Sequence, residues 1–276
     1  MSHRYWAVLF LCIMMGGTGL FYMWTAPSVG SEEVEIYRGV YYRSIDVPDT
    51  EEGSGQAHLV RVDLSAEGVH PFITPIDSSV VDRGAQYRLR FVRQIARWGG
   101  LAVAVNGTGF RDFGRFPLPR RTARSVHTVI SEGTASHIHP HSYMIWGDST
   151  DIPYIAHSKP PPDSVLEKAQ WGIGGSEVML RDGVPRSGTG RTPDRRTVLA
   201  IDSDASLLWL ATFEDASFFV AAQLLAEAGA QDAIPLDGGG STALYIGSDA
   251  SNVSTGYTMG GWRPVATHMG VYAEPL

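Results

Sequence analysis

Cysteine is almost absent from this 276-residue sequence. Its one cysteine, Cys12, lies in an uncharged N-terminal segment, so the rest of the chain has no disulfide framework and no thiol chemistry. A chain of this length can bury enough apolar surface to fold without disulfides. An exported protein without disulfides fits a bacterial periplasm or cell surface better than a small secreted eukaryotic scaffold, and we expect that location.

Positive charge is also scarce. The 22 Lys and Arg residues are outnumbered by 29 Asp and Glu, which gives a formal net charge of −7. This balance argues against nucleic acid as the main partner. Arginine is locally dense between Phe110 and Arg124. We interpret this stretch as a solvated loop, with recruitment of an anionic substrate as the alternative.

Long apolar runs are rare, and the exception is residues 5–25, which carry no charge and follow His3 and Arg4. As a helix this run would be about 30 Å long, the thickness of the bilayer hydrocarbon. It predicts an uncleaved membrane anchor with the body of the chain exported; a cleaved signal peptide is the alternative. The expected division is 1–26 anchor or signal, 27–56 linker and first strand, and 57–276 the main domain.

Glycine and proline are abundant, with 31 and 16 residues, and few segments show long apolar periodicity. The sequence therefore predicts a single α+β domain with a mixed, strand-rich sheet core and two or three packed helices. Apolar residues recur at helical spacing over 87–97, before Gly99 and Gly100, and over 216–229. A further helical turn is expected at 165–170.

The most informative stretch is 234–245, where an apolar run ends at Asp237, three glycines follow, and Ser241 and Thr242 lead into another apolar run. It predicts a strand, a tight turn and a strand. Successive glycines indicate positive φ or close backbone approach, and their N–H groups can form a nest for an anion such as phosphate. Asp237 could then transfer a proton. The alternative is an ordinary glycine-rich hairpin whose Asp accepts backbone hydrogen bonds.

Two further patterns hold candidate ligands. Asn106 follows the apolar run 101–105 and either caps a turn or binds a ligand. His137, His139 and His141 would share one face of a strand and could bind a metal ion, but Pro140 interrupts them. An exposed loop is the simpler interpretation, and we expect no metal and no cofactor.

Taken in order, six motifs resemble the phosphodiester glycosidase family, whose animal member removes N-acetylglucosamine to uncover mannose 6-phosphate. The match spans about residues 100–275 and is of the type associated with bacterial exopolysaccharide biosynthesis. Segments 111–127 and 135–172 depart from the family pattern. The matching motifs are Val105–Phe110, Val129–Gly133, Ile173–Gly175 with Leu180 and Asp182–Gly183, Arg196–Thr197, Leu236–Ser241 and Arg263–Val265.

The resemblance implies hydrolysis of a sugar-1-phosphodiester. Asp237 is the expected acid/base, or the carboxylate that stabilises positive charge at the anomeric carbon, and Arg196 the second catalytic residue. Guanidinium groups of Arg196 and Arg263 suit phosphate oxygens. Asp202 and Glu177 are weaker candidates for a second carboxylate. The substrate-binding set is Asn106, Gly174, Gly175, Gly238, Gly239, Gly240, Ser241, Thr242 and Arg263.

The expected function is therefore that of an exported glycoside hydrolase acting on sugar-1-phosphodiester bonds of cell-envelope or exopolysaccharide glycans. Hydrolysis of another phosphodiester or glycosidic bond by the same site is one alternative. A non-catalytic envelope-polysaccharide binding or assembly protein with the same anion pocket is a second, and a metal hydrolase built on His137, His139 and His141 is a distant third.

Overall fold

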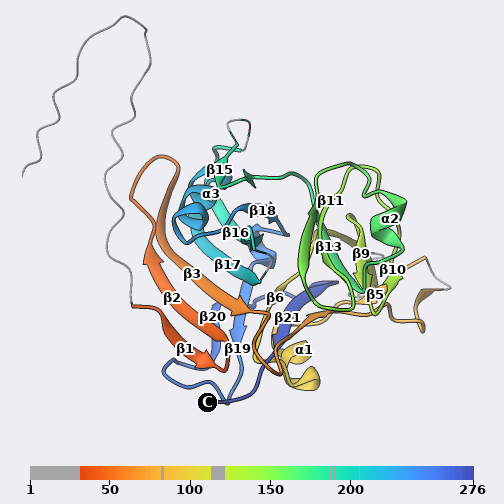
Figure 1. Ribbon diagram of the computed structural model, residues 1–276, viewed down its shortest axis with the longest axis horizontal. Coiled ribbons are helices and arrows are strands. Elements are labelled where there is room, and N and C mark those ends of the chain that lie inside the picture. The colour runs from red at the N-terminus through yellow and green to blue at the C-terminus, as the bar shows by residue number, and fades with distance from the viewer. Residues whose placement is uncertain (1–31, 82–83, 113–121, 187, 189, 205) are drawn as a thin grey trace, which may run out of the picture.

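The computed structural model describes residues 32–81, 84–112, 122–186, 188, 190–204 and 206–276. Within these ranges the chain forms four β-sheets and three α-helices (Figure 1). The prediction of a strand-rich α+β domain with few helices is confirmed. The expected mixture of parallel and antiparallel strands is wrong, because every strand pair among the described residues is antiparallel.

The largest sheet has eight strands, and its middle consists of the long pairs β2–β3, β3–β17 and β17–β16. The strands in spatial order are β1 (Val34–Tyr37), β2 (Val40–Asp46), β3 (Gly53–Asp63), β17 (Leu207–Ala216), β16 (Asp194–Ile201), β18 (Asp232–Pro235), β14 (Leu180–Arg181) and β15 (Val184–Pro185). Because β1 and β2 belong to this sheet and β3 begins at Gly53, residues 34–56 are continuous with the domain that was expected to start at 57.

The other three sheets are smaller and share no strand with the first. One contains β10 (Thr134–Ala135), β9 (Val129–Ser131), β13 (Trp171–Gly175), β11 (Tyr143–Gly147) and β12 (Pro153–Ala156). Another contains β20 (Gly256–Gly260), β19 (Ala243–Ile246), β6 (Val103–Asn106), β21 (His268–Tyr272) and β4 (His70–Ile73). The last contains β5 (Tyr87–Arg88), β8 (Thr122–Ser125) and β7 (Phe110–Asp112).

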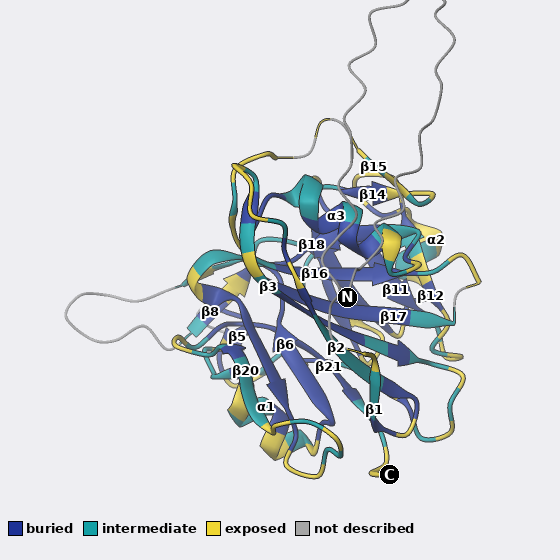
Figure 2. Cartoon of the chain, turned by 90° about the vertical axis from the view of Figure 1, so that its left-hand side faces the viewer, coloured by how far each residue is buried: buried dark blue, intermediate teal, exposed yellow. Residues whose placement is uncertain are grey.

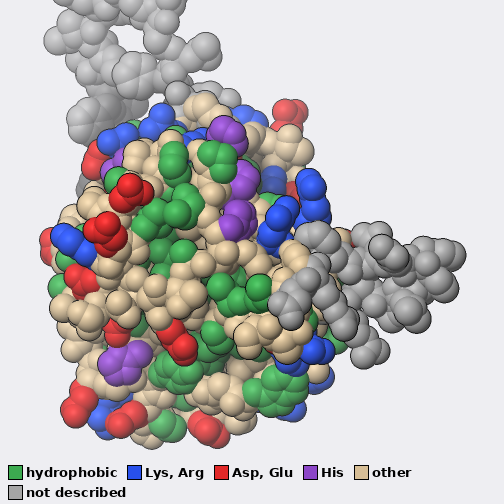
Figure 3. Space-filling view, turned by 90° about the vertical axis from the view of Figure 1, so that its right-hand side faces the viewer, with side chains coloured by type: hydrophobic (Ala, Val, Ile, Leu, Met, Phe, Trp, Pro, Cys, Tyr) green, Lys and Arg blue, Asp and Glu red, His purple; other side chains and the backbone are tan. Residues whose placement is uncertain are grey.

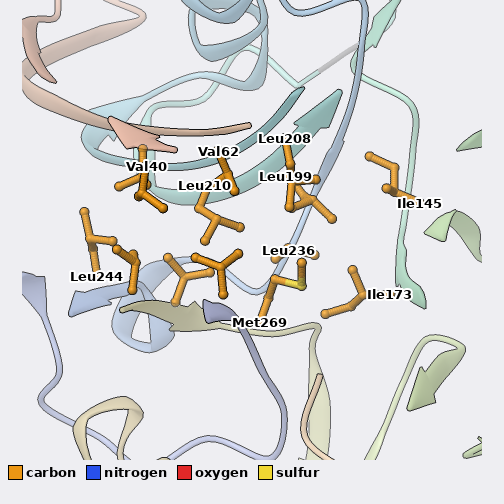
Figure 4. Packing of buried hydrophobic residues seen from close by; sticks show 14 of the residues in the cluster. Val40, Val62, Ile145, Ile173, Leu199, Leu208, Leu210, Leu236, Leu244 and Met269 are labelled. Atoms are coloured by element: carbon orange, nitrogen blue, oxygen red, sulfur yellow. The ribbon is translucent and has the colours of Figure 1, made fainter. Parts of the chain in front are cut away.

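The main hydrophobic core lies between the large sheet and the sheets of β6 and β13. Figure 4 shows its side chains facing one another from these layers: Val40, Val62, Leu199, Leu208 and Leu210 on one side, Leu236, Leu244 and Met269 on the other, and Ile145 and Ile173 beside them. Each fully buried leucine contributes about 1.5–3 kcal/mol relative to an exposed one. Alternation along β17 then directs Trp209 and Phe213 to the opposite face of the large sheet, into a second core.

Helix α3 (Phe218–Glu227) packs on that opposite face through Ala221, Ala222 and Leu225. The hydroxyl of Ser217 accepts a 3.1 Å hydrogen bond from the Val220 N–H group, which satisfies one of the free donors of the first turn. Gly229, at φ +99°, follows its end. The helix expected at 216–229 is confirmed. Figure 2 shows it beside buried strands, with exposed residues concentrated in loops and on outer helix faces.

Helix α1 (Val92–Gly99) covers the outer face of the β6 sheet and ends at Gly100, whose φ is +66°. The expected start at Tyr87 is wrong by five residues. Tyr87 and Arg88 instead form β5, which pairs with β8, and Arg90 bridges to Val265. Backbone groups committed to strand pairing cannot also make helical hydrogen bonds.

Helix α2 spans only Asp163–Leu166, so the helical turn lies earlier than the expected 165–170. The predicted anchor, residues 5–25, lies outside the described residues. Within the ranges that the structure does describe, no helix is both long and apolar enough to cross a bilayer.

Candidate active site

The glycine-rich turn connects two sheets. It leaves β18 of the large sheet, passes through a 3₁₀ helix at Gly239–Ser241, and enters β19 of the β6 sheet. The expected strand, turn and strand are therefore present, but the alternative of a hairpin is wrong, because β18 and β19 do not pair. Gly239 has φ +57°, and a Cβ on Gly238 would lie 2.8 Å from the carbonyl oxygen of Arg195. Positive φ and close backbone approach both occur here.

Asp237 is half-buried at the start of this turn. Its N–H group donates to the carbonyl of Gly107 over 3.0 Å. Burial raises the pKa of its carboxyl group, and hydrogen bonds from the Ser241 hydroxyl and the Gly238 N–H, with the charge of Arg263, oppose that rise without cancelling it. A carboxyl group poised in this way can take up and release a proton nearer to neutral pH than an ordinary aspartate.

Asn106 fixes Asp237 from behind. Its side-chain nitrogen donates to the carbonyl of Asp237 over 2.7 Å and to that of Gly107 over 3.2 Å, while its oxygen accepts from Thr197 Oγ1 at 2.6 Å and from the Ala243 N–H at 3.0 Å. The side chain is fully buried and its hydrogen-bonding capacity is used up. Asn106 was expected either to cap a turn or to bind a ligand; in the structure its side chain bonds the backbone of the turn and the Thr197 hydroxyl.

Arg196 borders the first glycine of the turn. Its Nε donates to the Ala216 carbonyl over 3.1 Å and Nη2 to the Thr192 carbonyl over 2.7 Å. Nη1 faces the turn, where it would lie 3.6 Å from a Cβ on Gly238. Burial lowers the pKa of this guanidinium, which an arginine tolerates while remaining charged. Nε and Nη2 of Arg196 thus anchor the side chain, and Nη1 is directed at the turn.

A carboxylate also lies at this end of the turn. Asp194 Oδ2 is 4.0 Å from Nη1 of Arg196 and would be 3.5 Å from a Cβ on Gly239. Asp194 is exposed and is the residue where β16 begins. Its charge partly offsets that of Arg196 at the first half of the turn, so the second half is the more positive.

Arg263 borders the third glycine. Its Cδ would lie 3.6 Å from a Cβ on Gly240, its guanidinium lies 5.2 Å above the Phe110 ring, and its charge acts on Asp237. The side chain is exposed and makes no salt bridge or hydrogen bond with the described residues. The N–H groups of Gly239 and Gly240 are likewise unbonded to any described residue. These donors and the two arginines make the turn a place for a phosphate.

The remaining predicted site residues lie behind this surface. Gly174 and Gly175 are buried in β13, where a Cβ on Gly175 would lie 2.5 Å from the carbonyl oxygen of Pro235. They allow β13 to pack against the end of β18. Ser241 is buried and its hydroxyl bonds Asp237. Thr242 is buried as well, and its Oγ1 has no partner among the described residues.

Sequence reasoning gave little weight to Glu177, which the structure places near the turn. It is half-buried; burial raises its pKa, and the charges of Lys159, Arg196 and Arg186 oppose that rise. It lines a cavity of about 730 Å³ together with Tyr143, His157, Lys159, Val178, Arg181, Asp182, Val184, Pro185, Arg186 and Gly188. Asp237 does not line this cavity, but Glu177 and Arg196 connect the two regions electrostatically. No sequence motif marks Glu177, because its position follows from the packing of β13 on β18.

Other predicted candidates fall outside this site. Asp202 bonds Ser206 and Leu207 at a turn, so it closes the β16–β17 hairpin. In the arginine-rich stretch, Arg111 and Arg124 are exposed on β7 and β8, whereas Arg115, Arg120 and Arg121 lie outside the described residues.

A family model for phosphodiester glycosidases matches residues 99–272, more than half of the chain and all of the turn. A search of curated proteins found no match.

Two solved structures share the fold. The catalytic domain of zebrafish N-acetylglucosamine-1-phosphodiester α-N-acetylglucosaminidase, auto-inhibited by its pro-peptide, has a TM-score of 0.61 at 16% identity, with 89% of each chain covered. A hypothetical protein from Synechocystis has a TM-score of 0.54 at 14% identity, covering 86% of this chain and 62% of that one.

Proposed function

The chain belongs to the phosphodiester glycosidase family of hydrolases, and from that premise we propose that it is an exported enzyme that releases a sugar from a sugar-1-phosphodiester in a cell-envelope glycan. One observation carries the proposal: Arg196 and Arg263 border the first and third glycines of a turn that begins with a half-buried carboxyl group. The two arginines that would bind the phosphate and the carboxyl group that would transfer a proton thus lie at one backbone turn.

The phosphate contacts follow from the free donors. Nη1 of Arg196, the guanidinium of Arg263 and the N–H groups of Gly239 and Gly240 are all available to phosphate oxygens. Because these donors are held by the fold before substrate arrives, they also stabilise the charge that grows on the departing phosphate. The sugar then lies on the Asp237 side of the phosphate.

The reaction breaks the bond between the anomeric carbon and the phosphate oxygen. Water forms the new bond to that carbon, its proton passes to a carboxylate, and the electron pair leaves with the phosphate monoester. Asp237 is the proposed proton acceptor, or the carboxylate that stabilises positive charge on the anomeric carbon. A phosphate is already a good leaving group, so the Arg clamp takes the place of a strong general acid.

The cavity beside Glu177 gives room for the glycan. Its volume of about 730 Å³ lies in the usual range for small-molecule sites. Tyr143 lines it with an aromatic ring, one face of which is covered by the Lys159 ammonium at 4.3 Å from the centroid. Neither the sugar nor the partner that keeps the phosphate follows from these residues.

The test is a panel of UDP-sugars and sugar-1-phosphodiesters incubated with the full-length chain, with released sugar followed by mass spectrometry. The proposal expects release by the parent and none by Asp237→Asn. The control is Arg38→Ala, since Arg38, between β1 and β2, makes an exposed ion pair with Glu274. No release from any substrate, with glycan binding retained, would instead support a non-catalytic polysaccharide-binding protein.

A further inference from the structure

Four imidazole rings gather at one place on the surface. His139 lies at the centre, with ring centroids 5.7 Å from His127, 5.9 Å from His137 and 5.8 Å from His141. Figure 3 shows histidine side chains in a column on this side of the molecule, with Lys and Arg side chains close by. None of the motifs that carry the family resemblance contains these four histidines, and none of the site residues named above is among them.

Hydrogen bonds between two loops hold the cluster. The fully buried Ser142 hydroxyl lies 3.0 Å from Nδ1 of His127 and accepts from the Thr128 N–H at 3.1 Å. The hydroxyl of Thr128 in turn accepts from the His139 N–H at 2.9 Å. The imidazoles are therefore presented by an ordered backbone, a condition for a specific binding surface.

The surroundings of the cluster are positive. The charged groups acting on His127 are His139, His137 and Lys159, and those acting on His137 are Arg124 and His139; no described carboxylate acts on either ring. Tyr87 reaches the same loops through Ser136 and Ser125, but its buried phenol has a pKa of about 12 and is neutral. In a chain of net charge −7, this is a local excess of cationic and protonatable groups.

The cluster adjoins the candidate active site. Val126, the residue before His127, and the Asp237 carboxylate both lie beside Gly109, where a Cβ would be 3.0 Å from Val126 Cγ2 and 3.9 Å from Asp237 Oδ1. Lys159 belongs to both regions, since it acts on His127 and lines the cavity beside Glu177. A chain bound at the phosphate turn and extending along this face would pass the imidazoles.

A metal ion is the obvious competing ligand for four histidines. Among the described residues, however, no three His, Cys, Asp or Glu side chains are placed to share one ion. The rings of the other three histidines each meet the central His139 ring edge to face, so the four rings do not surround a common point. In His139, Nδ1 accepts from the His141 N–H at 3.3 Å, and in His127, Nδ1 bonds the Ser142 hydroxyl, so each of these rings has Nε2 left to donate to an anion.

We propose that His127, His137, His139 and His141, with Arg124 and Lys159, form a binding site for the acidic part of a glycan substrate, and that it binds more tightly as the pH falls. The choice of a glycan as the anion rests on the proposed function. Within this account the anionic groups are phosphates or carboxylates along the polymer, beyond the bond that is cleaved.

The pH dependence follows from linkage. Burial, the other histidines and Lys159 lower the pKa of His127 to about 4, and burial, Arg124 and His139 lower that of His137. A bound anion favours the charged rings and raises both pKa values, so binding takes up protons. Affinity must therefore increase as pH falls toward these pKa values and decrease as pH rises.

The experiment measures binding of a short inorganic polyphosphate and of polygalacturonate to the full-length chain by calorimetry, with neutral dextran as the blank. The parent is expected to bind both anions about tenfold more tightly at about pH 5.5 than at about pH 8, the change in affinity that uptake of one proton gives over one pH unit of this interval. Heats measured in buffers of different ionisation enthalpy should show proton uptake.

The variant replaces His137, His139 and His141 by Asn together. The matched control is His70→Asn, because His70 lies on β4, outside the cluster, and pairs with Asp151. The triple variant should lose the pH dependence and keep turnover of a short sugar-1-phosphodiester, while the control retains both. His141→Asn alone, at an exposed position, gives a smaller loss if the triple variant fails to fold.

Four results would each overturn the proposal. They are equal affinity at the two pH values, unchanged binding by the triple variant, binding only to anionic vesicles, and binding that depends on Zn²⁺ and is removed by a chelator. The two proposals fail separately. Turnover without pH-dependent polyanion binding removes the histidine site alone, and binding without turnover removes the glycosidase assignment and the glycan identity while leaving an anion site.

Discussion

The side-chain amide of Asn106 donates a 2.7 Å hydrogen bond to the main-chain carbonyl of Asp237, 131 residues away along the chain. Asn106 is the last residue of β6, and Asp237 follows β18 of the large sheet. The bond therefore ties the candidate catalytic turn to two sheets at once. Because it engages the main chain, it leaves the Asp237 carboxyl group to the Ser241 hydroxyl and the Gly238 N–H.

Asn106→Asp is expected to destabilise the protein by roughly 2–5 kcal/mol, because it removes both amide donors and buries a carboxylate against two carbonyl groups. Activity should fall with it, since Asp237 loses its anchor. Urea unfolding measures the first effect. Asn252→Asp, at an exposed residue that makes one hydrogen bond to Glu35, is the control and should change stability by less than about 0.5 kcal/mol. Equal costs at the two positions would contradict the role of Asn106.

The turn glycines differ in what they tolerate. Gly238→Ala would place a Cβ 2.8 Å from the backbone oxygen of Arg195, whereas at Gly240 the nearest atom is the flexible Arg263 side chain at 3.6 Å. We expect Gly238→Ala to cost about 1–3 kcal/mol of unfolding free energy and Gly240→Ala to lie within about 1 kcal/mol of the parent. Thermal melts compare the two. Similar melting temperatures would show that the turn is not sterically constrained at Gly238.

Variants of Arg263 and Arg196 should separate an effect on turnover from an effect on stability. Arg263 is exposed and makes no protein hydrogen bond in the described ranges, so Arg263→Ala should weaken turnover by about 10- to 100-fold with melting unchanged. Arg196→Ala should lower both turnover and the melting temperature, because it also leaves the Ala216 and Thr192 carbonyls without their hydrogen-bond donor. Kinetics and melts on both variants, with Arg38→Ala alongside, measure this split. Full activity in Arg263→Ala would remove it from the clamp.

Ser241 controls the protonation of Asp237. Its hydroxyl bond lowers the pKa of a carboxyl group that burial has raised, so Ser241→Ala should raise that pKa further. If ionised Asp237 is the active form, the acidic limb of the pH–rate profile moves to higher pH in this variant. The conservative variant Ser241→Thr keeps a hydroxyl and should restore the limb. A limb that stays in place would mean that another group sets it.

Local patterns predicted the parts of the fold that depend on neighbouring residues. Helix α3 follows from its own apolar spacing and is capped by Ser217. The glycine turn was predicted because successive glycines are typical of positive φ or close backbone approach. The start of α1 was missed because Tyr87 pairs with Ala123, a partner that helical periodicity does not reveal.

The candidate site shows the same division. Asp237, Arg196 and Arg263 lie in motifs whose chemistry is readable, and the structure brings them together at one turn. The role of Asn106 depends on partners 91 to 137 residues away, and no local pattern distinguishes a saturated asparagine from a ligand. Glu177 acts electrostatically on Arg196 from a loop that follows β13, and its place depends on the packing of Gly175 against Pro235.

The most direct test of the central claim is hydrolysis of a sugar-1-phosphodiester in ¹⁸O-labelled water by the full-length chain, with both products weighed by mass spectrometry. Cleavage between the anomeric carbon and oxygen predicts ¹⁸O in the released sugar, none in the phosphate product, and no reaction with Asp237→Asn. Label in the phosphate would mean attack at phosphorus, and would make this protein a phosphodiesterase built on a glycosidase fold.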